Sequence, residues 1–346
     1  MSDKTQTNRQ RFLDACACQH VDRPPIWMMR QAGRSLPEYR ELKQKYSFVQ
    51  MVQTPDLATE VTMQPIRRFG FDAAVMFSDI LVIPEAMGQS YKFRDQGGIQ
   101  MKFSINNQQD VDRLNVDGVV ERLSYVSGAI SQIHKELDGK TALLGFAGSP
   151  WTLANYMIEG GSTPEFARAH QLRRAEPKLF EQLMSKLTRS IIDYLKMQVA
   201  AGVDAIQVFD SMGGMLSSGE YSEVSGRWIG EIIESLDGIV PVILFSRDTA
   251  GSLQELVQTG AQVLGLDWSI RLSEARSRVP SSIALQGNLD PTVLTTTPET
   301  AARETSRILE EMRGNNGFIF NLGHGVPPDA KLENIESVVS VVKSFK

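Results

Sequence analysis

The sequence predicts one α/β domain, spanning residues 1–346 and folded as a TIM-type (β/α)₈ barrel. Short apolar runs of strand length alternate with longer helical patterns, which is typical of a parallel sheet covered by helices on both faces. Eight such runs are present, the number of strands that closes a barrel. Nearly every run is followed at once by polar or glycine residues, which a barrel gathers at its carboxyl-terminal mouth. An open doubly wound sheet is the alternative, and it would spread the same residues along a crevice.

The predicted strands are short, mostly apolar runs, as expected for strands that are buried on both faces. In chain order they are Ile26–Met29, Ala73–Phe77, Ala142–Phe146, Asp204–Phe209, Val240–Phe245, Gln262–Leu266, Ile283–Leu285 and Phe318–Phe320. Between them, a threonine followed by proline predicts a helix start, because Thr caps a helix and Pro suits its first position. This pair occurs at Thr54-Pro55, Thr163-Pro164 and Thr297-Pro298, and the last of these helices should end near Gly314.

The composition restricts the class of protein. The chain carries 36 Lys and Arg against 41 Asp and Glu, a net charge of −5, which argues against a nucleic-acid-binding protein. No apolar run approaches the roughly 18 residues of a membrane span, and the polar N-terminal segment has no signal-peptide core. Cys16 and Cys18 are too close together for an ordinary structural disulfide. We therefore expect a cytoplasmic enzyme.

Several common kinds of site are excluded by spacing. Gly139-Lys140-Thr141 resembles part of a phosphate-binding loop, but His134 stands where a Walker motif has its first glycine. No serine lies in a G-x-S-x-G elbow, which argues against an α/β-hydrolase. The four histidines are widely spaced and no cysteine follows Cys18, so a zinc ligand set is missing. We expect no metal and no cofactor.

The segment after the first predicted strand is the first candidate site. Arg30 follows the strand directly, and Arg34 comes after a glycine. Guanidinium groups suit carboxylates because two N–H donors match two oxygens and each bond is charge-assisted. Arg40, Lys43 and Lys45 extend the basic segment. The two lysines are equally consistent with a solvated basic loop.

Other candidates follow the second and third predicted strands. Asp79 stands between a strand end and an apolar pair, a position that suits either a helix cap or a functional acid in a partly dry pocket. Tyr156 lies one turn beyond a glycine-rich segment, although taken alone it is more typical of an aromatic residue at the edge of the core. The pair Gly160-Gly161 would let the backbone approach a ligand.

Two further strand ends complete the predicted ring. Ser211 lies in the segment Asp210–Gly214, which follows the fourth strand, and His324 stands between two glycines after the last strand. A histidine in that position has little to pack against, which favours contact with a ligand over a place in the core.

These segments together resemble the uroporphyrinogen decarboxylase family. They occur in the family's order over nearly the whole chain: 29–34, FSDIL (77–81), GSPWTLANYMIEGG (148–161), FDSMGG (209–214), QGNLDP (286–291) and NLGHGV (321–326). The chain departs from the family at Met212 and Gly213, where Trp-Ala or Trp-Gly is usual, at Trp151, where many members have Phe, and at Lys43, where some have Arg. These departures concern the wall of the pocket.

The resemblance implies a (β/α)₈ barrel, usually a homodimer, that removes the four acetate carboxyls of uroporphyrinogen III. The product is coproporphyrinogen III, an intermediate of tetrapyrrole (haem or chlorophyll) biosynthesis. No cofactor is implied, because a pyrrole protonated at its α-carbon becomes a cation that accepts the electron pair left by CO₂.

The resemblance also implies a role for each candidate. Asp79 accepts hydrogen bonds from the pyrrole N–H groups and stabilises the developing positive charge. Arg30 and Arg34 bind substrate carboxylates, and Arg30 is a candidate proton donor, unorthodox because its pKa exceeds about 12. Tyr156 polarises the reacting acetate. The substrate-binding set is Arg30, Gln31, Ala32, Gly33, Arg34, Asp79, Tyr156, Ser211 and His324, and the catalytic set is Asp79, Arg30 and Tyr156.

Two other classes of protein are alternatives. A corrinoid-linked methyltransferase of the same superfamily needs a zinc-binding His/Cys set, and this chain has no cysteine after Cys18. A tetrapyrrole-binding protein without catalytic activity would be expected to lack Asp79 or Arg30, and both are present.

Overall fold

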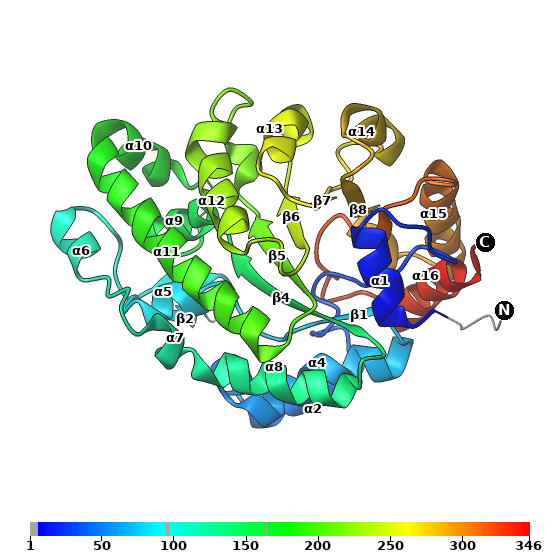
Figure 1. The fold of residues 1–346 in the computed structure, drawn as a ribbon. Helices are drawn as coiled ribbons and strands as arrows, with labels where there is room; N and C mark the ends of the chain where they lie inside the picture. The colour runs from blue at the N-terminus through cyan, green and yellow to red at the C-terminus, as the bar shows by residue number, and fades with distance from the viewer. Residues whose placement is uncertain (1–5, 95–96, 164) are drawn as a thin grey trace.

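A curled sheet of seven parallel strands forms the centre of the molecule (Figure 1). The computed structural model describes residues 6–94, 97–163 and 165–346. The strands lie in the order β1-β4-β5-β6-β7-β8-β9, so that each strand pairs with the next strand of the same sheet along the chain. Their bounds are β1 Ala73–Val75, β4 Ala142–Gly148, β5 Ala205–Asp210, β6 Val242–Ser246, β7 Val263–Gly265, β8 Ala284–Leu289 and β9 Phe318–Leu322. The prediction of a parallel α/β sheet is confirmed.

Helices surround the convex side of this sheet (Figure 1). The α-helices are α1 Asn8–Cys16, α2 Pro37–Lys45, α3 Phe48–Gln53, α4 Pro55–Phe69, α5 Val82–Ala86, α6 Gln108–Asp112, α7 Val119–Arg122, α8 Ser124–Leu137, α9 Pro150–Glu159, α10 Ala167–Ala175, α11 Pro177–Ala201, α12 Arg227–Ser235, α13 Leu253–Gln258, α14 Leu272–Arg278, α15 Pro298–Glu311 and α16 Leu332–Ser344. Short 3₁₀ turns lie at Gly213–Met215, Ala250–Ser252 and Pro291–Thr295, and a π-helical turn lies at Ser222–Gly226. In the described residues no helix is both long and apolar enough to cross a bilayer.

Two of the three predicted helix starts are confirmed, since α4 begins at Pro55 and α15 at Pro298. Thr297 accepts a hydrogen bond from the N–H of Thr300, the expected capping contact. The third start, Thr163-Pro164, includes residue 164, which lies outside the described residues; the next described helix, α10, begins at Ala167. Helix α15 ends at Glu311, before the left-handed Gly314, because the last turn closes through Met312.

The first predicted strand, Ile26–Met29, forms only a single parallel bridge, between Ile26 and Phe320 of β9. The N–H of Trp27 donates to the Phe320 carbonyl of β9 at 3.4 Å, but side chains take up the N–H groups on either side of it. The N–H of Ile26 donates to the Asp72 carboxylate at 2.8 Å, and that of Met29 donates to Asn321 Oδ1 at 3.0 Å. The segment nevertheless lies between the sheet edges, since Ile26 also accepts the N–H of Asp72 at 2.9 Å.

The core has two layers, as a curled sheet requires. Inside the curl, small residues at the amino ends of the strands give way to large aromatic rings towards the carboxyl ends. A buried chain of hydrogen bonds crosses this interior: Trp27 Nε1 donates to Gln286 Oε1 at 2.9 Å, and Gln286 Nε2 donates to Gln207 Oε1 at 2.9 Å. Residues on the opposite side of each strand, such as Ile206 and Val208, pack against the helices.

A two-stranded antiparallel hairpin, β2 (Tyr91–Phe93) and β3 (Ile99–Met101), is an addition that the sequence did not predict. It explains the pair Gly160-Gly161. A Cβ on Gly161 would lie 2.2 Å from the carbonyl oxygen of Ile99, and Gly161 bridges Gln100. Gly161 therefore admits the backbone of the hairpin, which gives this glycine a packing role.

Candidate active site

The carboxyl ends of the parallel strands meet at one edge of the curled sheet, where barrel enzymes carry out their chemistry. The register aligns these ends: Asp210 pairs with Ser246, and Asn288 pairs with Asn321. Arg30, Asp79, Ser211 and His324 all follow directly on segments of this sheet or its edge. The sheet thus brings residues that are far apart in the sequence to one mouth.

Arg30 is held at the mouth by a strained backbone. Its φ is +58°, in the left-handed region that a residue other than glycine seldom adopts. The side chain is exposed, and its aliphatic part runs over Gly325: a Cβ on Gly325 would lie 2.3 Å from Arg30 Cδ. Only glycine at position 325 leaves room for this course. The structure therefore connects Arg30 to the NLGHGV segment 295 residues later in the sequence.

Asp79 lies in the turn after β1 and before α5. Its Oδ1 accepts the N–H of Leu81 at 2.8 Å, so the side chain closes a local turn of the type Asp often forms. Burial raises the pKa of Asp79, while the bond from Leu81 and the positive charge of Arg30 act in the opposite direction. Asp79 is thus both a turn-forming residue and a desolvated acid at the mouth.

Tyr156 lies on the second turn of α9, within electrostatic reach of both Asp79 and Arg30. Burial raises the pKa of Tyr156, the negative charge of Asp79 raises it further, and Arg30 lowers it. Its ring packs edge-on against Phe166, with centroids 5.4 Å apart. The three residues of the predicted catalytic set therefore lie close enough to influence one another's charge.

His324 borders an aromatic floor inside the curl. Its ring packs edge-on against Phe245 at 6.2 Å, and the series continues from Phe245 to Phe209 and then to Phe146. Burial is the main cause that lowers the pKa of His324 to about 4, and the charges of Arg30 and Arg247 add to it. His324 is therefore neutral near pH 7. The floor suits a flat apolar ligand. The pattern of strand ends does not mark these phenylalanines.

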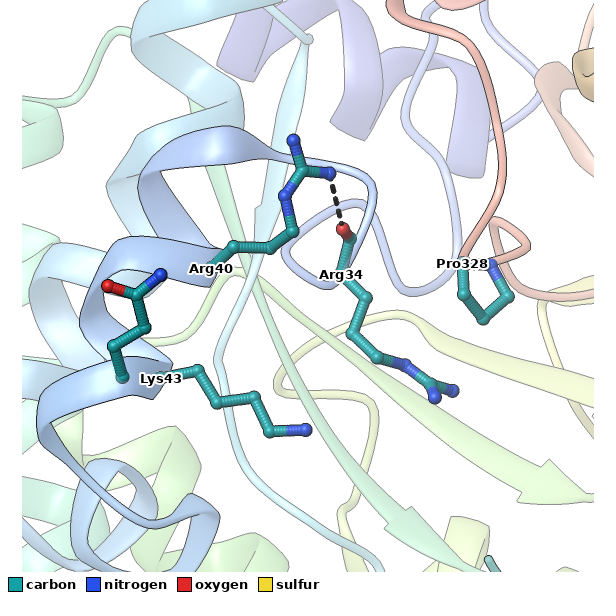
Figure 2. A pocket seen from close by; sticks show the side chains of 5 residues that line it. Arg34, Arg40, Lys43 and Pro328 are labelled. Atoms are coloured by element: carbon teal, nitrogen blue, oxygen red, sulfur yellow. Dashed lines mark hydrogen bonds between the residues drawn. The ribbon is translucent and has the colours of Figure 1, made fainter.

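Arg34, Arg40 and Lys43 line an open pocket of about 420 Å³ with Gln44 and Pro328. Figure 2 shows Arg34 between Lys43 and Pro328, with Arg40 folded back on the Arg34 carbonyl. That contact is a hydrogen bond of 3.0 Å from Arg40 Nη1. In the part of the chain that the structure describes, Arg34 and Lys43 form no ion pair. Their charges are available to an anion.

The remaining members of the predicted binding set differ in exposure. Ser211 is half-buried, as are Ala32 and Gly33. Gln31 is buried, and its side chain accepts the N–H of Met28 at 3.1 Å and donates to the Ala73 carbonyl at 3.1 Å. The Gln31 side chain thus supports the loop and does not face a ligand.

Four ionisable side chains near Asp79 were missed by the sequence analysis: Glu85, Tyr91, Tyr125 and Tyr194. Burial raises the pKa of each, and the negative charge of Asp79 adds to the rise. They come from α5, β2, α8 and α11, which surround the turn after β1. No strand-end pattern marks them, because each lies on an element of the outer layer. For the described residues, no group of three or more His, Cys, Asp or Glu is placed to hold a metal ion.

A curled parallel sheet of TIM-barrel-like type, with cations, an acid and an aromatic floor at the carboxyl ends of its strands, defines an α/β enzyme that acts at that mouth. The family model that matches is described as uroporphyrinogen decarboxylase, and it covers residues 7–345. The chain belongs to the uroporphyrinogen decarboxylase family.

Curated relatives agree over almost their whole length. The uroporphyrinogen decarboxylase of Methylobacillus flagellatus is 44% identical over 340 residues, which cover 96% of each chain. That of Alkalilimnicola ehrlichii is 45% identical over 338 residues, covering 96% of this chain and 93% of the relative. That of Pseudoalteromonas translucida is 43% identical over 99% of this chain and 98% of the relative.

A solved methyltransferase from Methanosarcina mazei shares the fold. It superposes with a TM-score of 0.83 over 98% of this chain and 99% of its own, at 18% identity. A putative vitamin-B12-independent methionine synthase from Listeria monocytogenes superposes with a TM-score of 0.55 at 8% identity. At such identities the likeness concerns the fold alone.

Proposed function

We propose that this protein is a carboxy-lyase that converts the four acetate side chains of uroporphyrinogen III to methyl groups, giving coproporphyrinogen III in tetrapyrrole biosynthesis. The observation that carries the proposal is the grouping of Asp79, Arg30 and Tyr156 at one mouth, above an aromatic floor, in a chain of this family. Each turnover replaces a carboxylate by a proton: R–CH₂–COO⁻ and H⁺ become R–CH₃ and CO₂.

Asp79 stabilises the positive charge that forms when a pyrrole is protonated. Protonation at the α-carbon creates a cation conjugated to the acetate, and loss of CO₂ returns the bonding electron pair to that cation. The exocyclic carbon then takes up a proton, and the pyrrole α-carbon releases the proton that it gained first. A carboxylate in a poorly solvated site interacts strongly with the cation, because little water screens the charge.

The cations bind the substrate's carboxylates. Arg30 and Arg34 each offer a guanidinium fork, and Arg34 shares its pocket with Lys43 (Figure 2). Tyr156 donates a hydrogen bond to the reacting acetate, since its raised pKa keeps the hydroxyl protonated near pH 7. Ser211 and neutral His324 bind propionates as hydrogen-bond donors, and the main chain of residues 31–33 borders the same ligand. No cofactor takes part.

The finer description of the molecule belongs to the same proposal. Residues Ile26–Met29 serve as the eighth strand that closes the barrel, supported by the parallel bridge between Ile26 and Phe320 of β9. Residues 1–346 form a single domain. The enzyme is a cytoplasmic homodimer, as the family resemblance and the composition suggest.

The test is anaerobic incubation of the purified protein with uroporphyrinogen III and no added cofactor. The products are oxidised, and the carboxyl groups on each porphyrin are counted by chromatography. Conversion from eight carboxyls to four supports the proposal. Quantitative recovery of the eight-carboxyl porphyrin, with a characterised decarboxylase active in parallel, would contradict it.

A further inference from the structure

We propose that Asp210 is a positioning residue, which acts through the N-terminus of α9 to hold Tyr156 in place over the mouth. The proposal rests on the proposed function, because it assigns Tyr156 a part in the reaction. The pattern of strand ends in the sequence assigns no role to Asp210.

Asp210 points away from the mouth. It is the last residue of β5, where the side chains of Gln207 and Phe209 face the interior of the curl and those of Ile206 and Val208 face the helices. By alternation Asp210 faces the helices too, and its exposed fraction is 0%. A carboxylate buried there cannot touch a ligand in the mouth.

Hydroxyl groups surround this carboxylate. Ser149 Oγ donates to Oδ1 at 2.6 Å and Thr152 Oγ1 donates to the same oxygen at 3.3 Å. On the other oxygen, Tyr221 donates at 2.8 Å and Ser246 Oγ at 3.2 Å. In the described residues no cation pairs with Asp210. Burial raises the pKa of Asp210, and the hydroxyls of Ser149, Tyr221 and Ser246 lower it.

The Oδ1 contacts fix the start of α9. Ser149 is the N-cap of that helix, since its Oγ accepts the N–H of Thr152 at 3.0 Å while donating to Asp210. Tyr156 lies seven residues after Ser149, two turns further along the same helix. A negative charge beside a helix N-terminus is also favoured by the helix dipole. A shift at the cap therefore moves Tyr156.

The same carboxylate fixes the loop that carries Ser211. Thr152 Oγ1 accepts the N–H of Met212 at 3.3 Å, so the loop is bonded to α9. A Cβ on Gly213 would lie 2.7 Å from Asp210 Oδ2 and 2.2 Å from Ser246 Oγ. The loop packs directly on the Asp210 group. Asp210 thus fixes the positions of Tyr156 and Ser211 relative to each other.

A double-mutant cycle tests this inference, with kcat and KM measured for the wild type, Asp210→Asn, Tyr156→Phe and the double variant. We expect Asp210→Asn alone to lower kcat by about 10- to 100-fold, the scale of a misplaced group, with KM changed by less than about threefold. In the Tyr156→Phe background the further loss should be no more than about twofold. An unchanged kcat, or equal fold losses in both backgrounds, would overturn the inference.

Ser149→Ala and Ser246→Ala form a matched pair. Each removes one hydroxyl from Asp210, and of the two only Ser149 belongs to the start of α9. Ser149→Ala should reproduce the loss in kcat, and Ser246→Ala should stay within about twofold of the wild type. Equal losses in the two variants would overturn the role of α9. Ser149→Ala also replaces Asp210→Asn in the cycle if the latter does not fold.

Amide hydrogen exchange separates this inference from the proposed function. In Asp210→Asn, peptides from residues 150–156 should exchange faster than in the wild type, while peptides from α15 should not. A wild type that does not decarboxylate uroporphyrinogen would overturn the proposed function, and exchange would still report on positioning. Unchanged exchange at 150–156 would overturn the positioning role.

Discussion

Asp79 closes a turn and, in the proposed function, also stabilises positive charge; a change to asparagine separates these two roles. Asn can still accept the N–H of Leu81, so the turn should survive. The charge is lost, and removing a preorganised electrostatic contact typically costs about 100- to 1,000-fold in turnover.

Asp79→Asn should therefore lose turnover by about that factor, with a thermal midpoint equal to or above that of the wild type. The sign of the stability change follows from burial, which raises the pKa of Asp79 and so disfavours its ionised form near pH 7. Both quantities are measured on one sample. Near-normal turnover would reduce Asp79 to a turn residue and remove the centre of the mechanism.

His324 should give the protein a pH-dependent stability. Its folded pKa, about 4, lies below the ordinary 6.5, so the unfolded chain binds a proton more readily between these values. This contribution to stability is complete above about pH 6.5 and is lost as the pH falls towards 4.

The measurement is the ring signal of His324 by NMR, assigned by comparison with His324→Gln. We expect no titration of that signal above about pH 5, and a smaller fall in thermal midpoint between pH 7 and pH 5 in His324→Gln than in the wild type. A signal that titrates near pH 6.5 would show a solvated ring and contradict this account of the site.

Residues at the mouth were predictable where a polar or charged residue comes soon after a predicted strand. Arg30, Asp79 and His324 all lie shortly after the ends of predicted strands. Tyr125 and Tyr194 were not predictable, because they reach Asp79 from α8 and α11 through packing between layers. Gln31 shows the opposite case: a residue inside the motif whose side chain serves the backbone.

At the scale of elements, the amino ends of the strands are closed by an ion network that lies opposite the mouth. Asp72 precedes β1 with an exposed fraction of 0%. It accepts hydrogen bonds from Arg11 at 3.0 Å and from Arg23 at 2.8 Å, and also from the N–H of Ile26. Residues at this end of a barrel serve stability rather than chemistry.

Asp72→Ala should therefore destabilise the protein without changing its reaction. Removing one partner from a buried ion pair typically costs about 3–5 kcal/mol, because the other charge is left unpaired. Chemical denaturation should show this loss, and kcat measured at a temperature where the variant is folded should match the wild type. A large fall in kcat in the folded variant would tie this end of the sheet to the mouth.

The elements were predicted best where hydrophobic pattern alone decides them. β4, β5 and β6 lie within two residues of their expected bounds at each end. The segment Ile26–Met29 has the pattern of a strand, yet the N–H of Ile26 donates to Asp72 and that of Met29 donates to Asn321. The periodicity of the sequence does not reveal such side-chain partners. The hairpin β2–β3 was not predicted because each strand has only three residues, and of these only Met101 of β3 is buried.

For the whole molecule, we expect activity that does not depend on a metal or an organic cofactor. The expectation rests on the chemistry of the pyrrole, which accepts the electron pair itself. Turnover should be unchanged after exhaustive dialysis against EDTA and in the absence of pyridoxal phosphate and nucleotides. Loss of activity that a single metal ion restores would contradict it.

A homodimer is expected from the family resemblance. Sedimentation velocity at the concentration used for turnover should give the mass of two chains of 38.4 kDa. A stable monomer with full activity would contradict the expectation and would show that one mouth is complete by itself.

The bond between Met29 and Asn321 spans 292 positions of the chain, and it has a consequence for how the enzyme is made. The segment before Arg30 leaves the ribosome first, yet its partners on β9 are among the last residues to appear. Such a separation in sequence slows folding, because a long loop must close before the contact forms. Arg30 therefore reaches its place only after synthesis is nearly finished, and a chain that stops short of residue 321 carries most of the sheet without the contact that holds the segment before Arg30.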